Sequence, residues 1–318
     1  MPFILRRLLF YVVAAWVALT INFFIPRAMP GNAVQSVMAK FPNLQPAAYK
    51  ALQALLGVGH PGSIWSQYVS YLNDIFHFNF GTDVSQYPAP VSSLLAQTLP
   101  WTIILVGTAL GIVAGWRHGG SLDRVLPGLM FLQAIPYFFF ALILVDLLAI
   151  KSHVFPTGQG YDNGLIPGWH GDFISSAVYH SLLPALTIVL TSIAGWMLQM
   201  RNVMITTIGE DYVIAAQAKG LPSRRVIFTY AARNALLPQL QGFGLAVGFV
   251  ISGALVMEIV FSYPGIGLLL LNAVTSNDYP LMQAIFLVIT FAVLIANLIV
   301  DMIVVFADPR ARTREATA

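Results

Sequence analysis

The sequence predicts an all-α polytopic membrane protein with six transmembrane helices, and two observations lead to this prediction. Of the 318 residues, 58% are hydrophobic and only 9% are charged, whereas a soluble domain has about 25% charged residues. One globular core could not bury so much apolar surface. Six apolar runs are long enough to cross a bilayer. They are approximately Leu8–Ile25, Leu99–Trp116, Gly128–Ile150, Leu182–Met200, Gln239–Phe261 and Leu281–Phe306.

The basic residues support six spans and predict their orientation in an inner or plasma membrane. With both termini in the cytoplasm, cytoplasmic segments hold 12 of the 16 Lys and Arg residues and outer segments hold 4, as the positive-inside bias requires. A five-span arrangement would place either the basic loop around residue 220 or the basic C-terminal segment outside. The net charge of +3 is small, and no basic patch with interleaved aromatic residues suggests nucleic-acid binding.

The first apolar run is expected to stay as a membrane helix. A cleaved signal peptide is the alternative, but the run of 18 residues exceeds the usual apolar region of about 7–15 and no small-residue cleavage pattern follows. Residues 29–91 are expected to form an outer insertion that contains a helix at Pro46–Leu56. Ser63 is expected to cap a second helix. Its apolar face would carry Ile64, Tyr68, Leu72, Ile75 and Phe76.

The segment Asp211–Pro238, between the fourth and fifth apolar runs, is the longest well-charged stretch. Apolar and small residues at helical spacing predict a helix that ends at Gly220, and Pro222 suits the first turn of a second helix. The residues at helical spacing in the first helix are Met204, Ile208, Tyr212, Ala215 and Ala216. Those in the second helix are Val226, Ile227, Tyr230 and Ala231. Two short helices joined at a glycine would make a rigid, partly apolar surface suited to receive another protein.

This segment resembles the signature loop of importer-type ABC transporter permeases. That pattern has Glu-Ala-Ala, three further residues, Gly, and Leu-Pro some way on. Here Ala215-Ala216, Gly220 and Leu237-Pro238 match the pattern, whereas Ile214 stands in the Glu position. The sequence around Gly220 and before Pro238 is similar to the dipeptide, oligopeptide and nickel branch of these permeases.

The resemblance implies a type I importer permease fold. The first transmembrane helix would lie in residues 1–28, the core in 92–306 with a cytoplasmic coupling loop at 201–238, and a cytoplasmic tail in 307–318. The chain would form half of a peptide pathway beside a second, homologous permease. Two cytoplasmic ATPase subunits would bind ATP and magnesium, and an extracellular binding protein would deliver the solute. The chain itself would catalyse no reaction and bind no cofactor.

The resemblance also implies that Pro222–Arg233 is a coupling helix that docks in a groove of the ATPase. Its apolar residues would supply adhesion and its arginines would supply orientation, although the arginines also serve as markers of the cytoplasmic side. The expected coupling residues are Ala215, Ala216, Gly220, Leu221, Pro222, Arg224, Arg225, Val226, Ile227, Tyr230, Arg233 and Pro238.

Polar residues interrupt the apolar runs at Asp146, Glu258, Asn297 and Asp301. Ionisable groups at membrane depth are costly and suggest a function, but each of these lies near the end of a span, so a structural role and contact with solute both stay open. Asn297 and Asp301 are four residues apart and share a helix face. The turn after Glu258 is expected to re-enter the membrane or cap the outer mouth of the pathway. The candidate pathway residues are Glu258, Ser262, Tyr263, Pro264, Gly265, Asn297 and Asp301.

Several function classes are disfavoured. The chain has no cysteine, which excludes disulfides and thiolate sites, and its six histidines are scattered without ligand spacing. We find no nucleophile motif and no phosphate-binding loop followed by Lys. The alternatives to a peptide permease are a nickel or oligosaccharide importer permease, an ion-coupled secondary transporter and a membrane scaffold protein. A secondary transporter would favour inverted halves and charges at mid-span, which the sequence does not clearly have.

Overall fold

The computed structural model describes residues 3–28, 63–83, 89–115, 134–232, 234–236 and 254–307, together with residues 128 and 131. Within these ranges every named element is helical, as the sequence predicts. The expected helix at Pro46–Leu56, most of the fifth predicted span and the C-terminal tail lie outside the described residues.

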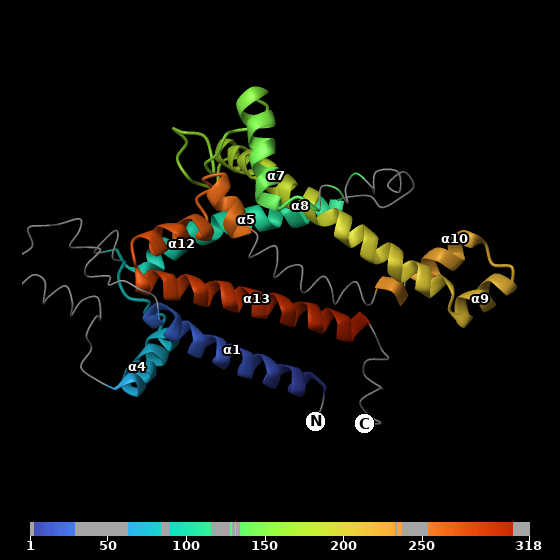
Figure 1. The fold of residues 1–318 in the computed structure, drawn as a ribbon, viewed down its shortest axis with the longest axis horizontal. Helices are drawn as coiled ribbons and strands as arrows, with labels where there is room; N and C mark the ends of the chain where they lie inside the picture. Colours follow the sequence, from blue (N-terminus) through green and yellow to red (C-terminus); the bar gives the residue numbers. More distant parts are fainter. Residues whose placement is uncertain are drawn as a thin grey trace, which may run out of the picture.

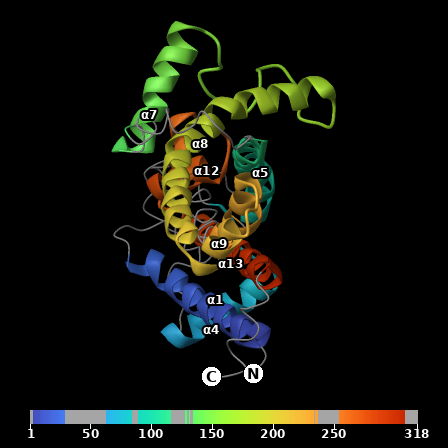
Figure 2. The same cartoon turned by 90° about the vertical axis from the view of Figure 1, so that its right-hand side faces the viewer.

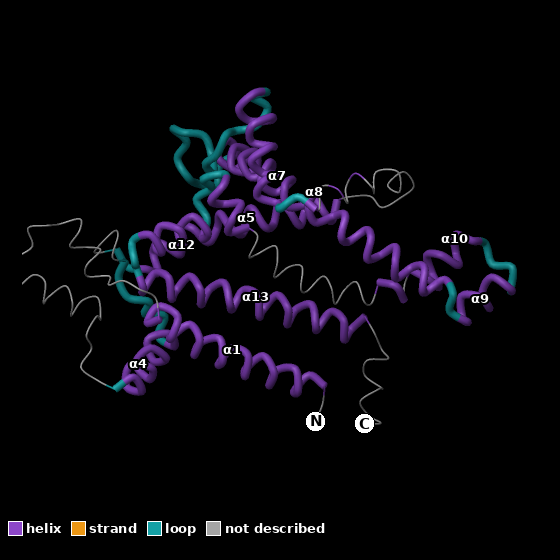
Figure 3. Tube along the Cα trace, viewed as in Figure 1, coloured by secondary structure: helices purple, strands orange, loops and turns teal. Residues whose placement is uncertain are grey.

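The helices differ widely in length (Figures 1 and 3). In chain order they are α1 (Phe3–Ala28), α4 (Ile64–Phe76), α5 (Val91–Gly115), α7 (Tyr137–Leu144), the π-helix η1 (Val145–Lys151), α8 (Gly171–Ile208), α9 (Asp211–Ala218), α10 (Ser223–Arg225), the π-helix η2 (Val226–Ala231), α12 (Ile266–Thr275) and α13 (Tyr279–Ala307). Residues 254–260 are helical as well.

Three of these helices are long and apolar enough to cross a membrane: Leu5–Ile25 in α1, Gly171–Ile208 in α8 and Tyr279–Ile303 in α13. They correspond to the first, fourth and sixth predicted spans, and α5 corresponds to the second. The third and fifth predicted spans lie partly outside the described residues, so the count of six stays a prediction. With 38 residues and a rise of 1.5 Å per residue, α8 measures about 57 Å along its axis. It therefore extends well beyond the span that hydropathy alone indicated.

The helices pack in two groups. One hydrophobic core joins α5, α7 and α8 with residues 254–263, and a second joins the start of α5 with α12 and α13. The helix α1 packs along α13 and runs antiparallel to it, so that Phe3 and Ala307 lie at the same end of the molecule (Figure 1). From the main body, α8 leads to α9 and α10 at the far end. Figure 2 shows that α8 is bent, with one part running across the view and the next part descending toward α9.

Local sequence chemistry explains where several helices begin. Ser63 caps α4, because its Oγ accepts a hydrogen bond from the backbone N–H of Ser66 at 3.3 Å. His170 caps α8 in the same manner, with its Nδ1 facing the N–H of Phe173 at 3.4 Å. The predicted cap at Ser63 is thus confirmed. Of the predicted apolar face of α4, Tyr68 is buried, whereas Ile64 and Phe76 are exposed.

Candidate functional site

The first predicted helix of the coupling loop is interrupted. The helix α8 ends at Ile208, Gly209 and Glu210 form a turn, and α9 begins at Asp211. This turn changes which side chains face inward. Val213 and Ala216 are buried, whereas Ile208 and Tyr212, which the sequence placed on one stripe with Ala216, are 41% and 38% exposed. The expected single stripe was therefore wrong beyond residue 208, because it assumed an unbroken helix.

The glycine joint is as the sequence predicts. Gly220 has φ +71°, a conformation that L-residues rarely adopt, and its N–H donates to the carbonyl of Gln217 at 2.9 Å. Pro222 then precedes α10, and its carbonyl accepts from the N–H groups of Arg225 at 2.8 Å and Val226 at 3.1 Å. Helix α10 continues directly into η2, so residues 223–231 form one helical segment.

The two helical pieces are held together by a small core. Its buried members are Val213, Ala216, Val226 and Ala231, and Met204, Leu221 and Tyr230 pack against them half-buried. The sequence assigned Val226 to the adhesive face of a docking helix. In the structure this side chain fills the core of the chain itself, so only neighbouring residues are left to contact a partner.

Beside these core residues, η2 also exposes apolar side chains. Ile227 is 41% and Phe228 is 66% exposed, and the adjoining Arg224 and Arg225 are exposed as well. Sequence reasoning missed Phe228, although it is the one aromatic residue of the segment outside the predicted stripe. Residues Arg233 and Pro238, also predicted to couple, lie outside the described part of the chain.

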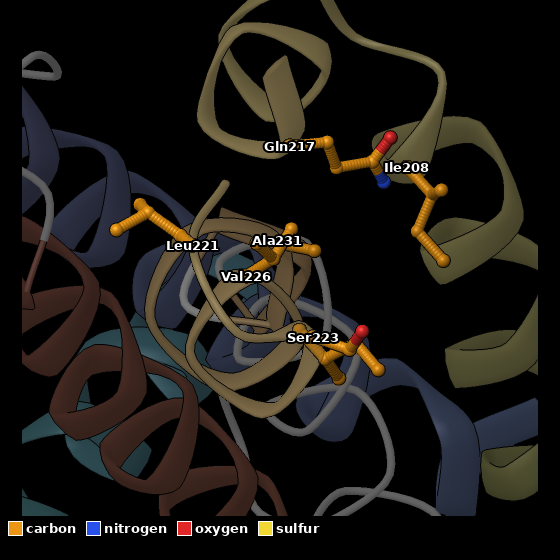
Figure 4. Close-up of a pocket in the computed structure, with 7 residues that line it drawn as sticks. Ile208, Gln217, Leu221, Ser223, Val226 and Ala231 are labelled. Atoms are coloured by element: carbon orange, nitrogen blue, oxygen red, sulfur yellow. The ribbon is translucent and has the colours of Figure 1, made fainter. Parts of the chain in front are cut away.

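A groove of about 400 Å³ opens between the two helical pieces (Figure 4). It is lined by Ile208, Gln217, Leu221, Ser223, Val226, Ile227 and Ala231. In Figure 4, Gln217 and Ile208 lie on one side of it, and Ser223, Val226 and Ala231 lie on the other. The predicted coupling loop thus presents a groove beside an exposed ridge, which comprises Arg224, Arg225, Ile227 and Phe228.

Glu258, the leading pathway candidate, is completely buried and holds another helix in place. Its Oε1 accepts from the hydroxyl of Thr102 at 2.6 Å, and its Oε2 accepts from the N–H of Gly267 at 2.5 Å. The Thr102 oxygen in turn accepts from the N–H of Ile266 at 3.0 Å. Glu258 and Thr102 together cap the N-terminus of α12, where unpaired N–H groups and the helix dipole favour a carboxylate.

The turn that follows Glu258 depends on close backbone approach. A methyl group on Gly265 would overlap the Glu258 carboxyl group, and one on Gly267 would overlap the backbone of Leu255. Tyr263 is fully buried, Gly265 is buried and Pro264 is half-buried, which leaves Ser262 as the exposed member of this predicted set. The turn leads into α12, whose 10 residues are too few to cross a bilayer.

Comparison with known proteins identifies the family. The family described as "binding-protein-dependent transport system inner membrane component" matches residues 107–313. The chain belongs to this family. It is similar to the oligopeptide transport system permease protein AppB of Bacillus subtilis, with 30% identity over 97% of this chain and 98% of the relative. It is also similar to the dipeptide transport system permease protein DppB of Escherichia coli K12 (30%, over 99% and 100%) and to the di/tripeptide transport system permease protein DppB of Pseudomonas aeruginosa (30%, over 98% and 99%).

As a family member, this permease is a multi-pass inner-membrane subunit of a binding-protein-dependent ABC importer. Such subunits are non-catalytic, and the importers to which they belong use ATPase and binding-protein partners. Membership confirms the recognition made from the coupling loop. It also confirms that the chain is a transport subunit rather than an enzyme.

The other polar residues of the permease have local partners. Asp301 accepts a hydrogen bond from the hydroxyl of Tyr11 at 2.7 Å and forms an ion pair with Arg7, so it ties α13 to α1. Asn297 donates to the carbonyl of Val293 at 2.9 Å within its own helix. Asp146 pairs with Lys151 at 2.7 Å on an exposed surface. The structure brings neither Asn297 nor Asp301 into contact with Glu258.

The loop between η1 and α8 covers the turn at Ser262–Gly267. Gln159 donates its N–H to the carbonyl of Phe261 at 3.1 Å, and Trp101 stacks on Tyr161 with ring centroids 5.4 Å apart. The loop is fastened to α8 because the Ser176 hydroxyl donates to the Asp162 carboxylate at 2.7 Å. Gln159 and Phe261 are far apart in the chain, so this contact could not be predicted from a single sequence.

Proposed function

We propose that this permease forms one half of the translocation pathway for di- or oligopeptides in an ATP-driven importer. A second homologous permease would supply the other half, two ATPase subunits would bind ATP and magnesium, and an extracellular binding protein would deliver the peptide. The observation that carries the proposal is the full-length similarity. Three relatives with peptide transport in their names each match 97% or more of this chain.

We further propose that both termini lie in the cytoplasm, together with α9, α10 and η2. The basic residues favour this orientation, since cytoplasmic loops carry an excess of Lys and Arg. The antiparallel packing of α1 and α13 agrees with it, because the first and last membrane helices then end on the same side.

In this proposal the ATPase binds the exposed ridge of η2. Phe228 and Ile227 supply the apolar contact, and Arg224 and Arg225 supply charge pairing at its edge. Burying a large apolar side chain is worth about 1.5–3 kcal/mol, so Phe228 would be the main anchor. The core around Val226 makes the two helical pieces one rigid body. A displacement of the ridge is therefore passed to α8 and shifts the permease between inward- and outward-facing states.

Transport by the assembled importer tests the proposed solute and energy source. The permease would be reconstituted in proteoliposomes with its second permease, ATPases and binding protein, and uptake of labelled dipeptides would be measured beside nickel and an oligosaccharide. We expect peptide uptake that requires ATP. Uptake of nickel or the oligosaccharide alone would overturn the peptide assignment, and uptake by the permease under an ion gradient without ATPases would overturn the importer mechanism.

Substitution of the ridge tests the docking surface separately. Phe228→Ala should weaken ATPase binding by about 10–150-fold, the equivalent of about 1.5–3 kcal/mol, and leave membrane insertion intact. Thr229→Ala is a matched control, because Thr229 is its exposed neighbour on the same segment. Val226→Ala should instead lower the stability of the loop. Equal ATPase affinity for the Phe228 and Thr229 variants would show that the ridge is not the docking surface.

A further inference from the structure

One apolar surface of the permease lies outside the coupling loop and the turn after Glu258. It is on α4, the helix of the outer insertion. Apolar residues occupy about half of the circumference of this helix, but among the described residues its neighbours cover only part of that face. Trp65, Val69 and Phe76 are 70%, 49% and 76% exposed. Together with half-buried Leu72 they follow the spacing i, i+4, i+7 and i+11 along one side of the helix.

The other part of the apolar face is attached to the end of α1. The hydroxyl of Tyr68 is 2.7 Å from that of Thr20, and the amide of Asn22 donates to the hydroxyl of Tyr71 at 3.0 Å. Phe23 packs edge-on against Tyr68, with ring centroids 5.2 Å apart. Figure 1 shows α4 lying across the end of α1 rather than alongside it.

These contacts fix the depth of α4 relative to the membrane. Thr20 and Asn22 lie inside the apolar segment Leu5–Ile25 that crosses the bilayer. Five residues of helix separate Thr20 from Ile25, which corresponds to about 7–8 Å of depth. A helix that contacts Thr20 from the side therefore lies at the boundary between headgroups and acyl chains, where interfacial helices bury their apolar face by about 5–10 Å.

The polar neighbours agree with this depth. Arg27, just beyond the apolar segment, stacks over the Phe23 ring at 3.6 Å and donates to Gln67 on the polar side of α4 at 3.4 Å. Arginine at the end of a span places its charge at the headgroup level. Ser66, Ser70 and Asn73 on the remaining side are exposed, as expected of a face turned toward water.

The end of α4 carries an aromatic residue at a position that favours glycine. The N–H of Asn79 bonds the carbonyl of Asp74 at 2.9 Å, and the N–H of Phe78 bonds the carbonyl of Ile75 at 3.0 Å. This is a Schellman motif, and Phe78 occupies its left-handed position with φ +54°. A left-handed non-glycine residue costs about 1–2 kcal/mol. The Phe78 ring contacts Phe80 edge-on, with centroids 6.4 Å apart, but the side chain is still 78% exposed. Burial of this exposed surface in lipid would offset the cost.

From these observations we propose that α4 is an interfacial helix. Its stripe of Trp65, Val69, Leu72 and Phe76, with Phe78, inserts into the lipid leaflet at the C-terminal end of α1. This is the outer leaflet in the orientation proposed above. The stripe adjoins the apolar face of α1, where Ile21 and Phe24 are 54% and 49% exposed and face lipid in a transmembrane chain. Asp74 is the one charged residue of α4, so the contact depends on apolar insertion rather than on anionic headgroups.

The absence of cysteine makes a direct test simple. Val69→Cys and Phe76→Cys on the stripe, and Ser70→Cys and Asn73→Cys on the polar side, each provide one site for a spin label in the full-length permease in phosphatidylcholine nanodiscs. Collision of each label with oxygen, which concentrates in lipid, is compared with collision with a water-soluble nickel chelate.

We expect the ratio of oxygen to nickel-chelate collisions to be several-fold higher at the two stripe positions than at the two polar positions. The ratio should stay the same when phosphatidylglycerol is added. Two results would overturn the proposal. Equal access of the nickel chelate to Val69 and Ser70 labels would place α4 in water, and shielding of the Val69 label from both reagents would mean that protein covers the stripe. Neither outcome depends on the transported solute.

Discussion

Replacing Glu258 by alanine should destabilise the permease more than any loss of a surface carboxylate. The Glu258 side chain is fully buried and accepts one hydrogen bond from Thr102 and one from Gly267. Glu258→Ala leaves both donors buried without an acceptor, at about 1–3 kcal/mol each, and removes one methylene group and the carboxyl group from a packed site. The expected loss of unfolding free energy is about 3–5 kcal/mol.

The measurement is unfolding of the purified permease by SDS in mixed micelles, followed by far-UV circular dichroism. Asp146→Ala is the control, because Asp146 is a half-exposed carboxylate whose pair with Lys151 should contribute about 1 kcal/mol or less. Thr102→Val gives a double-mutant cycle with Glu258→Ala. Since the two side chains share a hydrogen bond, their effects should fall short of additivity by about 0.5–3 kcal/mol.

Two results would refute this reasoning. A Glu258→Ala variant as stable as Asp146→Ala would show that the carboxylate does not hold α12. Strict additivity with Thr102→Val would show that the two residues act independently. If uptake were lost while stability stayed unchanged, Glu258 would contact solute, the role that the sequence left open.

Three further predictions concern other parts of the permease. Gly220→Pro should uncouple ATP hydrolysis from uptake in proteoliposomes without affecting insertion. Proline cannot adopt φ +71° and would lose the hydrogen bond from the N–H of residue 220 to Gln217. Normal coupling in this variant would contradict the prediction. Asp301→Asn should weaken the attachment of α1 to α13 by about 1–3 kcal/mol, measured as a lower unfolding midpoint. An unchanged midpoint would show that the ion pair of Asp301 with Arg7 contributes nothing to stability. Burial raises the pKa of Tyr71 from 10 to about 12, so neutral Tyr71 favours the docked α4. The contribution of Tyr71 to docking should be fully present below pH 10 and lost as the pH rises through 12, as followed with a Val69 label, and Tyr71→Phe should abolish this dependence.

Features set by local chemistry could be predicted from the sequence. Ser63 caps α4 and Gly220 ends α9 because the cap oxygen and the positive φ are properties of single residues. The burial of Val226 and exposure of Phe228 could not be predicted, because they depend on how α9 packs against η2 after the break at Gly209. Thr102 and Glu258 are 156 positions apart, and Tyr11 and Asp301 are 290 apart. A single sequence carries no sign of such pairs.

The length of α8 has a mechanical consequence. The part of α8 from Pro184 to Ile208 has 25 residues and is about 37 Å long, so a tilt of roughly 10° moves its end by about 6 Å. Pro184 cannot donate to the carbonyl four residues earlier, that of His180. Bending of α8 would therefore concentrate at Pro184. The stiffness of the helix at this position would determine how much of the displacement of one end of α8 reaches the other end.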